Sequence, residues 1–130
     1  MTMPREVRFE STGLKVKFTG LLHFATTTAE FMVPYAAIRG VSTQFPQLPK
    51  GVLRWGGASV PFTDIREGHF RSGDNWYFLS FEDRERIVTL HLEGLEVGKR
   101  LYRELVIQVP DPQRFVREIE TRLSTSASGG

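Results

Sequence analysis

Apolar and polar residues alternate along much of this chain, which is the pattern of β-strands with one face in a core. The clearest case is residues 14–18, where three apolar residues alternate with Lys15 and Lys17, so both lysines should face water. The same pattern predicts strands over residues 7–10, 26–33, 38–43, 68–71, 76–81, 87–92 and 101–109. Residues 21–25 are compatible with either a helical turn or a short strand.

The stretch 55–92 is the predicted centre of the sheet. Ser72 to Asn75 has the composition of a hairpin turn, and residues 76–81 are apolar on both faces, which predicts a strand covered on both sides. Gly56 and Gly57 predict a backbone bend, because no Lys-Ser/Thr pair follows them as a phosphate loop requires. Residues 93–99 contain two glycines and predict a mobile loop.

The C-terminal segment predicts one amphipathic helix. Asp111 is a preferred N-cap residue and Pro112 suits the first helical position. An apolar stripe at helical spacing follows, and we expect it to pack on residues 76–81; it consists of Phe115, Val116, Ile119 and Leu123. Residues 1–6 and 124–130 are expected to be a flexible start and a disordered tail, which leaves a single domain over residues 7–123.

Composition excludes several functional classes. The 130 residues carry 17 basic and 15 acidic side chains, a net charge of +2 that is too small to predict nucleic-acid binding. No apolar run approaches the roughly 20 residues of a spanning helix. The chain has no cysteine and starts without an apolar signal segment, so we expect a cytoplasmic protein, with peripheral attachment to a membrane as an open possibility.

The order of these elements resembles the pleckstrin-homology (PH) superfold, in which an antiparallel barrel is closed by one C-terminal helix. Three segments are similar to small bacterial PH-like proteins: residues 33–41 (VPYAAIRGV), residues 53–57 (LRWGG) leading to 68–70, and residues 105–115 (LVIQVPDPQRF). The resemblance covers roughly residues 7 to 123. It implies a mainly β fold, a PH-like, partly open antiparallel barrel of about seven strands capped by one C-terminal α-helix, and it also implies self-association.

No residue pattern predicts catalysis, a cofactor or a metal. The three histidines, His23, His69 and His91, lie far apart without the spacing of metal ligands, and there is no nucleophile elbow or cysteine. We therefore expect a protein that is not an enzyme and has no cofactor. The residues that best suit an interaction surface are basic or aromatic, and they are Lys15, Lys17, Arg54, Trp55, Arg66, His69 and Arg71.

Three functional hypotheses remain from the sequence. The first is a binding or scaffolding module that contacts a protein partner or a second copy of itself. The second is attachment to an anionic membrane surface through the basic residues of the N-terminal strands, Arg5, Arg8, Lys15 and Lys17. The third is a small-ligand carrier with a cavity inside the barrel, for which the ten phenylalanines are suggestive but are equally explained by core filling.

Overall fold

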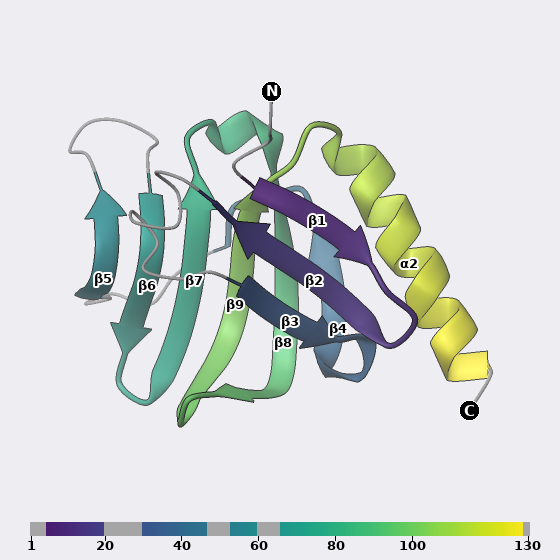
Figure 1. Ribbon diagram of the computed structural model, residues 1–130, viewed down its shortest axis with the longest axis horizontal. Coiled ribbons are helices and arrows are strands. Elements are labelled where there is room, and N and C mark those ends of the chain that lie inside the picture. Colours follow the sequence, from purple (N-terminus) through teal and green to yellow (C-terminus); the bar gives the residue numbers. More distant parts are fainter. Residues whose placement is uncertain (1–4, 20–29, 47–52, 60–65, 129–130) are drawn as a thin grey trace.

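The computed structural model describes residues 5–19, 30–46, 53–59 and 66–128, the side chains of 53–59, 66 and 125–128 excepted. These residues form two stacked β-sheets and a C-terminal helix (Figure 1). The smaller sheet, sheet A, has the order β1 (Arg5–Phe9), β2 (Gly13–Phe18), β3 (Glu30–Pro34). The larger, sheet B, has the order β4 (Ile38–Ser42), β8 (Ile87–Val97), β9 (Arg100–Gln108), β7 (Asn75–Phe81), β6 (Arg66–Ser72), β5 (Leu53–Ser59). The segment 21–25 lies outside the described residues.

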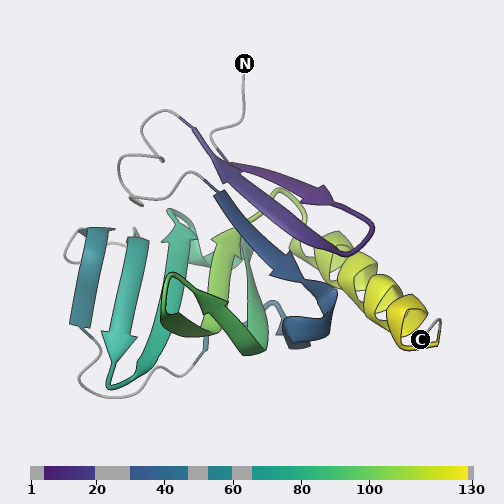
Figure 2. The same cartoon turned by 60° about the horizontal axis from the view of Figure 1, so that its bottom comes forward.

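The predicted fold class is confirmed: the protein is mainly β, the described strands do not close into a complete barrel, and a helix follows the last strand. Neighbouring described strands pair antiparallel except β7 and β9, which are parallel. In sheet B, β9 lies between β8 and β7; it is antiparallel to β8, with which it forms a hairpin, and parallel to β7. As Figure 2 shows, sheet A crosses over one face of sheet B, and its β1–β2 hairpin lies beside the helix.

Most of the core lies between the two sheets. Residues of both sheets and of the helix form one buried cluster, which includes Val16, Phe31, Phe78, Leu105 and Ile119. A second, smaller cluster covers the opposite face of sheet B and contains Phe70, Tyr77, Leu79, Phe81, Ile87 and Val106, with Phe45 packed against it. The strand β7 contributes to both clusters, so the prediction that residues 76–81 are covered on both sides is confirmed.

The helix α2 (Pro112–Ser128) begins as predicted. The carboxylate of Asp111 accepts a hydrogen bond from the backbone N–H of Arg114 at 3.2 Å, which is the N-cap interaction. The predicted packing partner is wrong: α2 packs mainly on β4, β8 and the short 3-10 helix η1 (Tyr35–Ala37), whereas the inner face of β7 is covered by sheet A. Its Phe115 ring also contacts the Phe9 ring of β1, with centroids 5.3 Å apart.

Described parts of three segments that were predicted to be irregular belong to strands or to the helix. Residues 93–99 are not a loop, because β8 continues to Val97 and the turn needs only Gly98 and Lys99, both at positive φ. The helix continues through Ser128 instead of ending before the predicted tail at 124. Arg5 and Glu6 belong to β1, so the strand starts inside the segment predicted to be flexible.

The packing of α2 gives a stability test. Ile119 is fully buried between α2 and the sheets, so Ile119→Ala should lower the free energy of unfolding by about 2–5 kcal/mol through lost burial and a residual cavity. The control is Val97→Ala, because Val97 is 41 % exposed and its truncation should change stability by less than about 0.5 kcal/mol. Urea denaturation followed by circular dichroism measures both variants; equal losses would contradict this packing.

Candidate binding cleft between β1 and α2

The residues predicted to form an interaction surface belong to strands of two different sheets. Lys15 and Lys17 are on the outer side of sheet A, where Lys15 is ion-paired with Glu10 at 3.8 Å and Glu30 at 3.5 Å. Arg71 is half-buried near the end of β6, with its guanidinium 5.6 Å from the centre of the Trp76 ring. The backbones of Arg54, Trp55 and Arg66 lie in β5 and β6, and their side chains are outside the described part of the structure.

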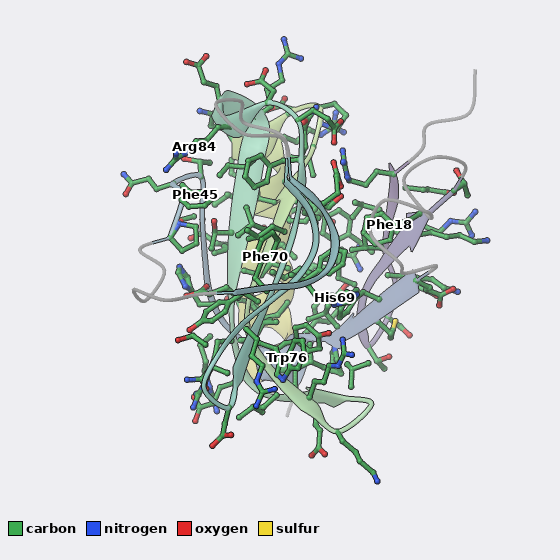
Figure 3. All side chains as sticks on the ribbon, turned by 90° about the vertical axis from the view of Figure 1, so that its left-hand side faces the viewer. Phe18, Phe45, His69, Phe70, Trp76 and Arg84 are labelled. Atoms are coloured by element: carbon green, nitrogen blue, oxygen red, sulfur yellow. The ribbon has the colours of Figure 1, made fainter. Side chains whose placement is uncertain are left out.

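His69 is buried between the sheets and does not belong to any exposed surface, contrary to the prediction. Figure 3 shows it on the side of sheet B that faces sheet A, whereas Phe45 and Arg84 lie on the opposite side. Its Nδ1 atom is 2.7 Å from the hydroxyl oxygen of Tyr102, and burial raises the pKa of that phenol although Arg100 lies nearby. The Tyr102 hydroxyl therefore stays protonated, and the pair satisfies two polar groups inside the core.

Aromatic rings fill the space between the sheets around His69. The Phe31 ring lies 4.6 Å from Phe78 and 5.2 Å from Tyr102, measured between centroids, and Phe18 contacts Phe78 at 5.3 Å. These are close-packed, tilted or edge-to-face contacts. The described phenylalanines of this region therefore serve as core.

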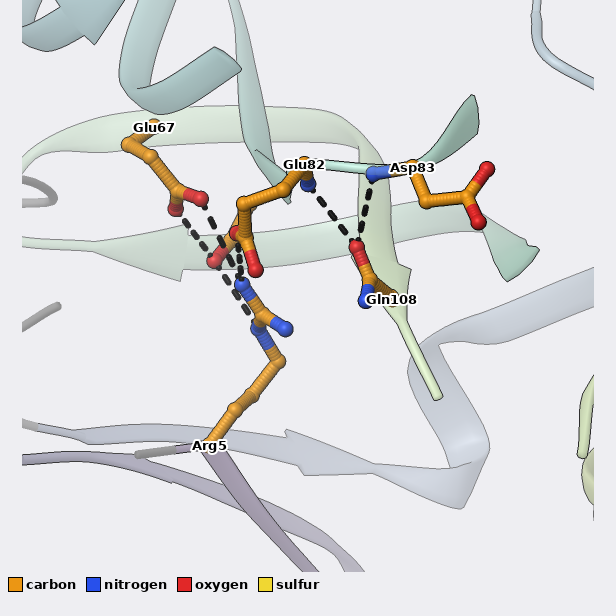
Figure 4. Close-up of polar contacts among 6 residues, drawn as sticks. Arg5, Glu67, Glu82, Asp83 and Gln108 are labelled. Carbon is orange, nitrogen blue, oxygen red and sulfur yellow. Dashed lines mark hydrogen bonds and ion pairs between the residues drawn. The ribbon is translucent and has the colours of Figure 1, made fainter. Parts of the chain in front are cut away.

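A buried polar cluster fastens the start of β1 to sheet B (Figure 4). The Arg5 guanidinium donates to Ser80 Oγ at 3.1 Å, to Glu67 Oε1 at 3.4 Å and to Glu82 Oε2 at 2.7 Å. Ser80 Oγ in turn donates to Glu67 Oε2 at 2.7 Å, and the amide oxygen of Gln108 accepts the backbone N–H groups of Glu82 and Asp83. Arg5, Glu67 and Ser80 are almost inaccessible to solvent, so the position of β1 is fixed by groups that have little access to water.

Protonation of the two carboxyl groups in this cluster differs. Burial, together with a hydrogen bond to Glu82, raises the pKa of Glu67 to about 8. Partial burial acts against ionisation of Glu82 too, yet its hydrogen bond with Glu67 and the charge of Arg5 lower the pKa of Glu82. Near neutral pH the cluster therefore holds the Arg5 cation, the Glu82 carboxylate and a largely protonated Glu67.

A cleft of about 940 Å³ lies next to this cluster. One wall is β1, the other is the first half of α2, and the end is formed by the turn after β7 and the last residues of β9. The inner lining is apolar and consists of Val7, Phe9, Val109, Pro110 and Phe115; charged residues surround it, namely Arg5, Glu6, Glu82, Arg86, Asp111, Arg114 and Glu118, with Gln108 beside them.

The cleft runs along the open edge of sheet A. Among the described strands β1 pairs with β2 alone, and the Glu10 N–H to Gly13 O hydrogen bond fixes which backbone groups pair. Because pairing alternates along an antiparallel ladder, Glu6 and Arg8 direct their N–H and C=O groups to β2. Arg5, Val7 and Phe9 direct theirs away from β2, towards the cleft that the same residues line.

The same register explains Pro34 at the other edge of sheet A. Gly13 lies opposite Pro34 in the β2–β3 ladder, and alternation from the Glu10–Gly13 pair makes this a position without ladder hydrogen bonds. Proline has no N–H to donate and occurs at such outward-facing edge positions. A proline at this position therefore agrees with the assignment of outward-facing groups in β1.

Both ends of the cleft are held in place. At one end are the Arg5 contacts; at the other, the Phe9 ring lies against Phe115 and beneath the Arg122 guanidinium, which is 5.3 Å from the ring centre. Arg122 is itself ion-paired with Glu118 at 2.9 Å. The two walls are thus held in place by contacts within the chain.

The structure gives no sign of a metal centre or a membrane-spanning helix in the residues it describes. None of their His, Asp and Glu side chains gather in a group that could hold a metal ion. Within the same residues, no helix combines the length and apolar character needed to cross a bilayer. The chain matches no protein-family model, and no curated protein or solved structure matches it either.

The raised pKa of Glu67 predicts how stability depends on pH. Folding favours the protonated form of the Glu67 carboxyl group. The stability that this group contributes is therefore complete below the ordinary glutamate pKa and is lost as pH rises through about 8. Between about pH 6 and pH 9 the free energy of unfolding should therefore fall, and Glu67→Gln should reduce that fall by on the order of 1–3 kcal/mol. Denaturant titrations at several pH values measure this difference.

The control is Glu93→Gln, which removes an exposed carboxylate paired with Arg39 outside the cluster. This variant should keep the slope of the unmodified chain. Parallel curves for the unmodified chain and Glu67→Gln across the range would show that the Glu67 carboxyl group is not protonated in the folded protein.

Proposed function

We propose that the protein is a non-enzymatic binding module that takes up an extended polypeptide segment as an additional strand on β1. One observation carries the proposal: the outward-facing backbone groups of Arg5, Val7 and Phe9 line the cleft between β1 and α2. An added strand would satisfy these groups with main-chain hydrogen bonds, and its alternate side chains would enter the cleft.

The size and chemistry of the cleft suit such a segment. β1 has five residues, and a strand of that length spans about 16 Å at roughly 3.3 Å per residue. Main-chain pairing supplies affinity with little dependence on the partner's sequence. The apolar inner lining of the cleft favours partner segments with an apolar side chain at every second position. The charged surround contains both signs, so it favours a partner with both basic and acidic residues over a uniformly charged one.

The proposal includes PH-like character and a cytoplasmic location. An open arrangement of two sheets with a C-terminal helix supports the first, and the absence of cysteine from the sequence is compatible with the second. Many binding domains of different origin accept a peptide at a sheet edge, so the binding mode follows from the edge and the cleft and does not depend on family.

The arrangement of charge supports this function over attachment to an anionic membrane. Of the four basic residues considered for that role, Arg5 is buried in ion pairs, Arg8 is paired with Glu6, and Lys15 is paired with Glu10 and Glu30. Lys17 lies opposite Glu6 in the β1–β2 ladder. Paired charges of this kind produce a weak field at a membrane surface. The packed aromatic interior likewise supports edge binding over a carrier cavity.

Val7→Pro tests the proposal. The Val7 N–H faces the open edge, so proline removes one donor for an added strand and places its ring in the way, while the bonds to β2 remain. Random dodecapeptides displayed on phage are selected against the unmodified chain at low protein concentration, and the affinity of the selected peptides is measured by fluorescence anisotropy. We expect enriched peptides with alternating apolar residues and at least about tenfold weaker binding to Val7→Pro.

The matched control is Met32→Pro. Met32 is exposed and faces outward on β3, the opposite edge of the same sheet, so the same chemical change there should leave peptide affinity unchanged. Both variants are first compared with the unmodified chain by circular dichroism. Selected peptides that bind Val7→Pro as tightly as the unmodified chain, or a selection that yields no peptide, would contradict the proposal.

A further inference from the structure

We infer that the strand accepted by β1 is β1 of a second copy of the chain, which gives a dimer with its two-fold axis at Val7. This inference rests on the proposed function, because it assigns an occupant to the same edge and cleft. A two-fold axis perpendicular to the sheet makes the two β1 strands antiparallel and joins the two copies of sheet A into one continuous sheet. The observations that carry it are the direction of the backbone groups and the order of charges in β1.

The backbone pattern of β1 is self-complementary. With the axis at Val7, the two copies of Val7 face each other, and Arg5 of each copy faces Phe9 of the other. These are the residues whose N–H and C=O groups point away from β2, so each facing pair exchanges both hydrogen bonds of an antiparallel ladder. The outward-facing N–H and C=O groups of Arg5, Val7 and Phe9 are thus hydrogen-bonded in both copies.

The charges of β1 are complementary in the same register. Glu6 of each copy faces Arg8 of the other, on the solvent side of the joined sheet. In a single copy these two side chains are ion-paired along their own strand at 2.8 Å, and they are exposed at 46 % and 66 %. Facing pairs of opposite charge stabilise a ladder, and like charges directly opposite destabilise it.

The neighbouring registers are disfavoured by charge. Only the backbone groups that point away from β2 can form hydrogen bonds between the two copies. The two-fold axis can therefore shift from Val7 only to a neighbouring residue, Glu6 or Arg8. An axis at Glu6 sets two glutamates against each other, and an axis at Arg8 sets two arginines against each other. The register centred on Val7 is the one that joins opposite charges and uses the full length of β1.

The cleft provides an apolar surface for the arriving strand. Val7 and Phe9 of the second copy face the same side of the joined sheet as their counterparts, which is the side of the apolar lining formed by Val109, Pro110 and Phe115. The joined sheet therefore places the apolar side chains of both β1 strands on one side, next to the apolar lining of both clefts.

A charge exchange in the full chain tests the register. Arg8→Glu and Glu6→Arg each set like charges against each other at the interface, so each variant alone should dissociate at least about tenfold more readily than the unmodified chain. An equimolar mixture of the two variants should form a heterodimer, and the double variant Glu6→Arg/Arg8→Glu should again self-associate. Sedimentation equilibrium between about 10 μM and 1 mM measures all four.

The control is Arg117→Glu, which makes the same change of charge at an exposed position of α2 outside the cleft and should dimerise as the unmodified chain does. Recovery in the mixture and in the double variant excludes misfolding as the cause of dissociation. A monomeric unmodified chain at 1 mM, or single variants that dimerise unchanged, would overturn the inference. Peptide binding that depends on Val7 in a chain that remains monomeric would overturn the dimer alone and leave the proposed function standing.

Discussion

The contacts of Arg5 with sheet B determine whether β1 can act as a binding edge. β1 has five residues and, among the described strands, one neighbour, so pairing with β2 alone leaves it free to tilt away from the helix. Arg5 fixes one end through Ser80, Glu67 and Glu82, and the Phe9 ring fixes the other end against α2. The cleft keeps its shape because both ends of one wall are attached to the rest of the molecule.

Burying a charged residue is unfavourable unless the charge is paired and hydrogen-bonded. The Arg5 cluster meets this condition, and it also limits its own net charge. Arg5 has two carboxyl neighbours, but the pKa of Glu67 is raised by burial, so one neighbour is neutral and one is ionised near neutral pH. Such a cluster adds less stability than an apolar contact of the same size would. It does specify position, because a displaced Arg5 would leave several buried polar groups without partners.

Local patterns in the sequence predicted most strands and the helix, but not the packing between them and not the site. Alternation predicted residues 14–18 as a strand, Ser72 to Asn75 marked the hairpin turn, and Asp111 with Pro112 marked the helix start, because each depends on neighbouring residues. The packing surface of α2, the burial of His69 and the order of residues 93–99 depend on partners distant in sequence. The cleft is built from residues near 5–9, 82–86 and 108–118, so no single motif could reveal it.

Amide hydrogen exchange at β1 tests the central claim, that its outward-facing backbone groups pair with β1 of a second copy. The amides of Val7 and Phe9 point towards the cleft, and those of Glu6 and Arg8 are bonded to β2. When exchange is followed residue by residue by NMR, the account predicts that Val7 and Phe9 exchange rapidly in dilute solution and slow down as protein concentration rises, while Glu6 and Arg8 stay protected throughout. Exchange at Val7 and Phe9 that does not change with concentration would contradict pairing of β1 with a second copy.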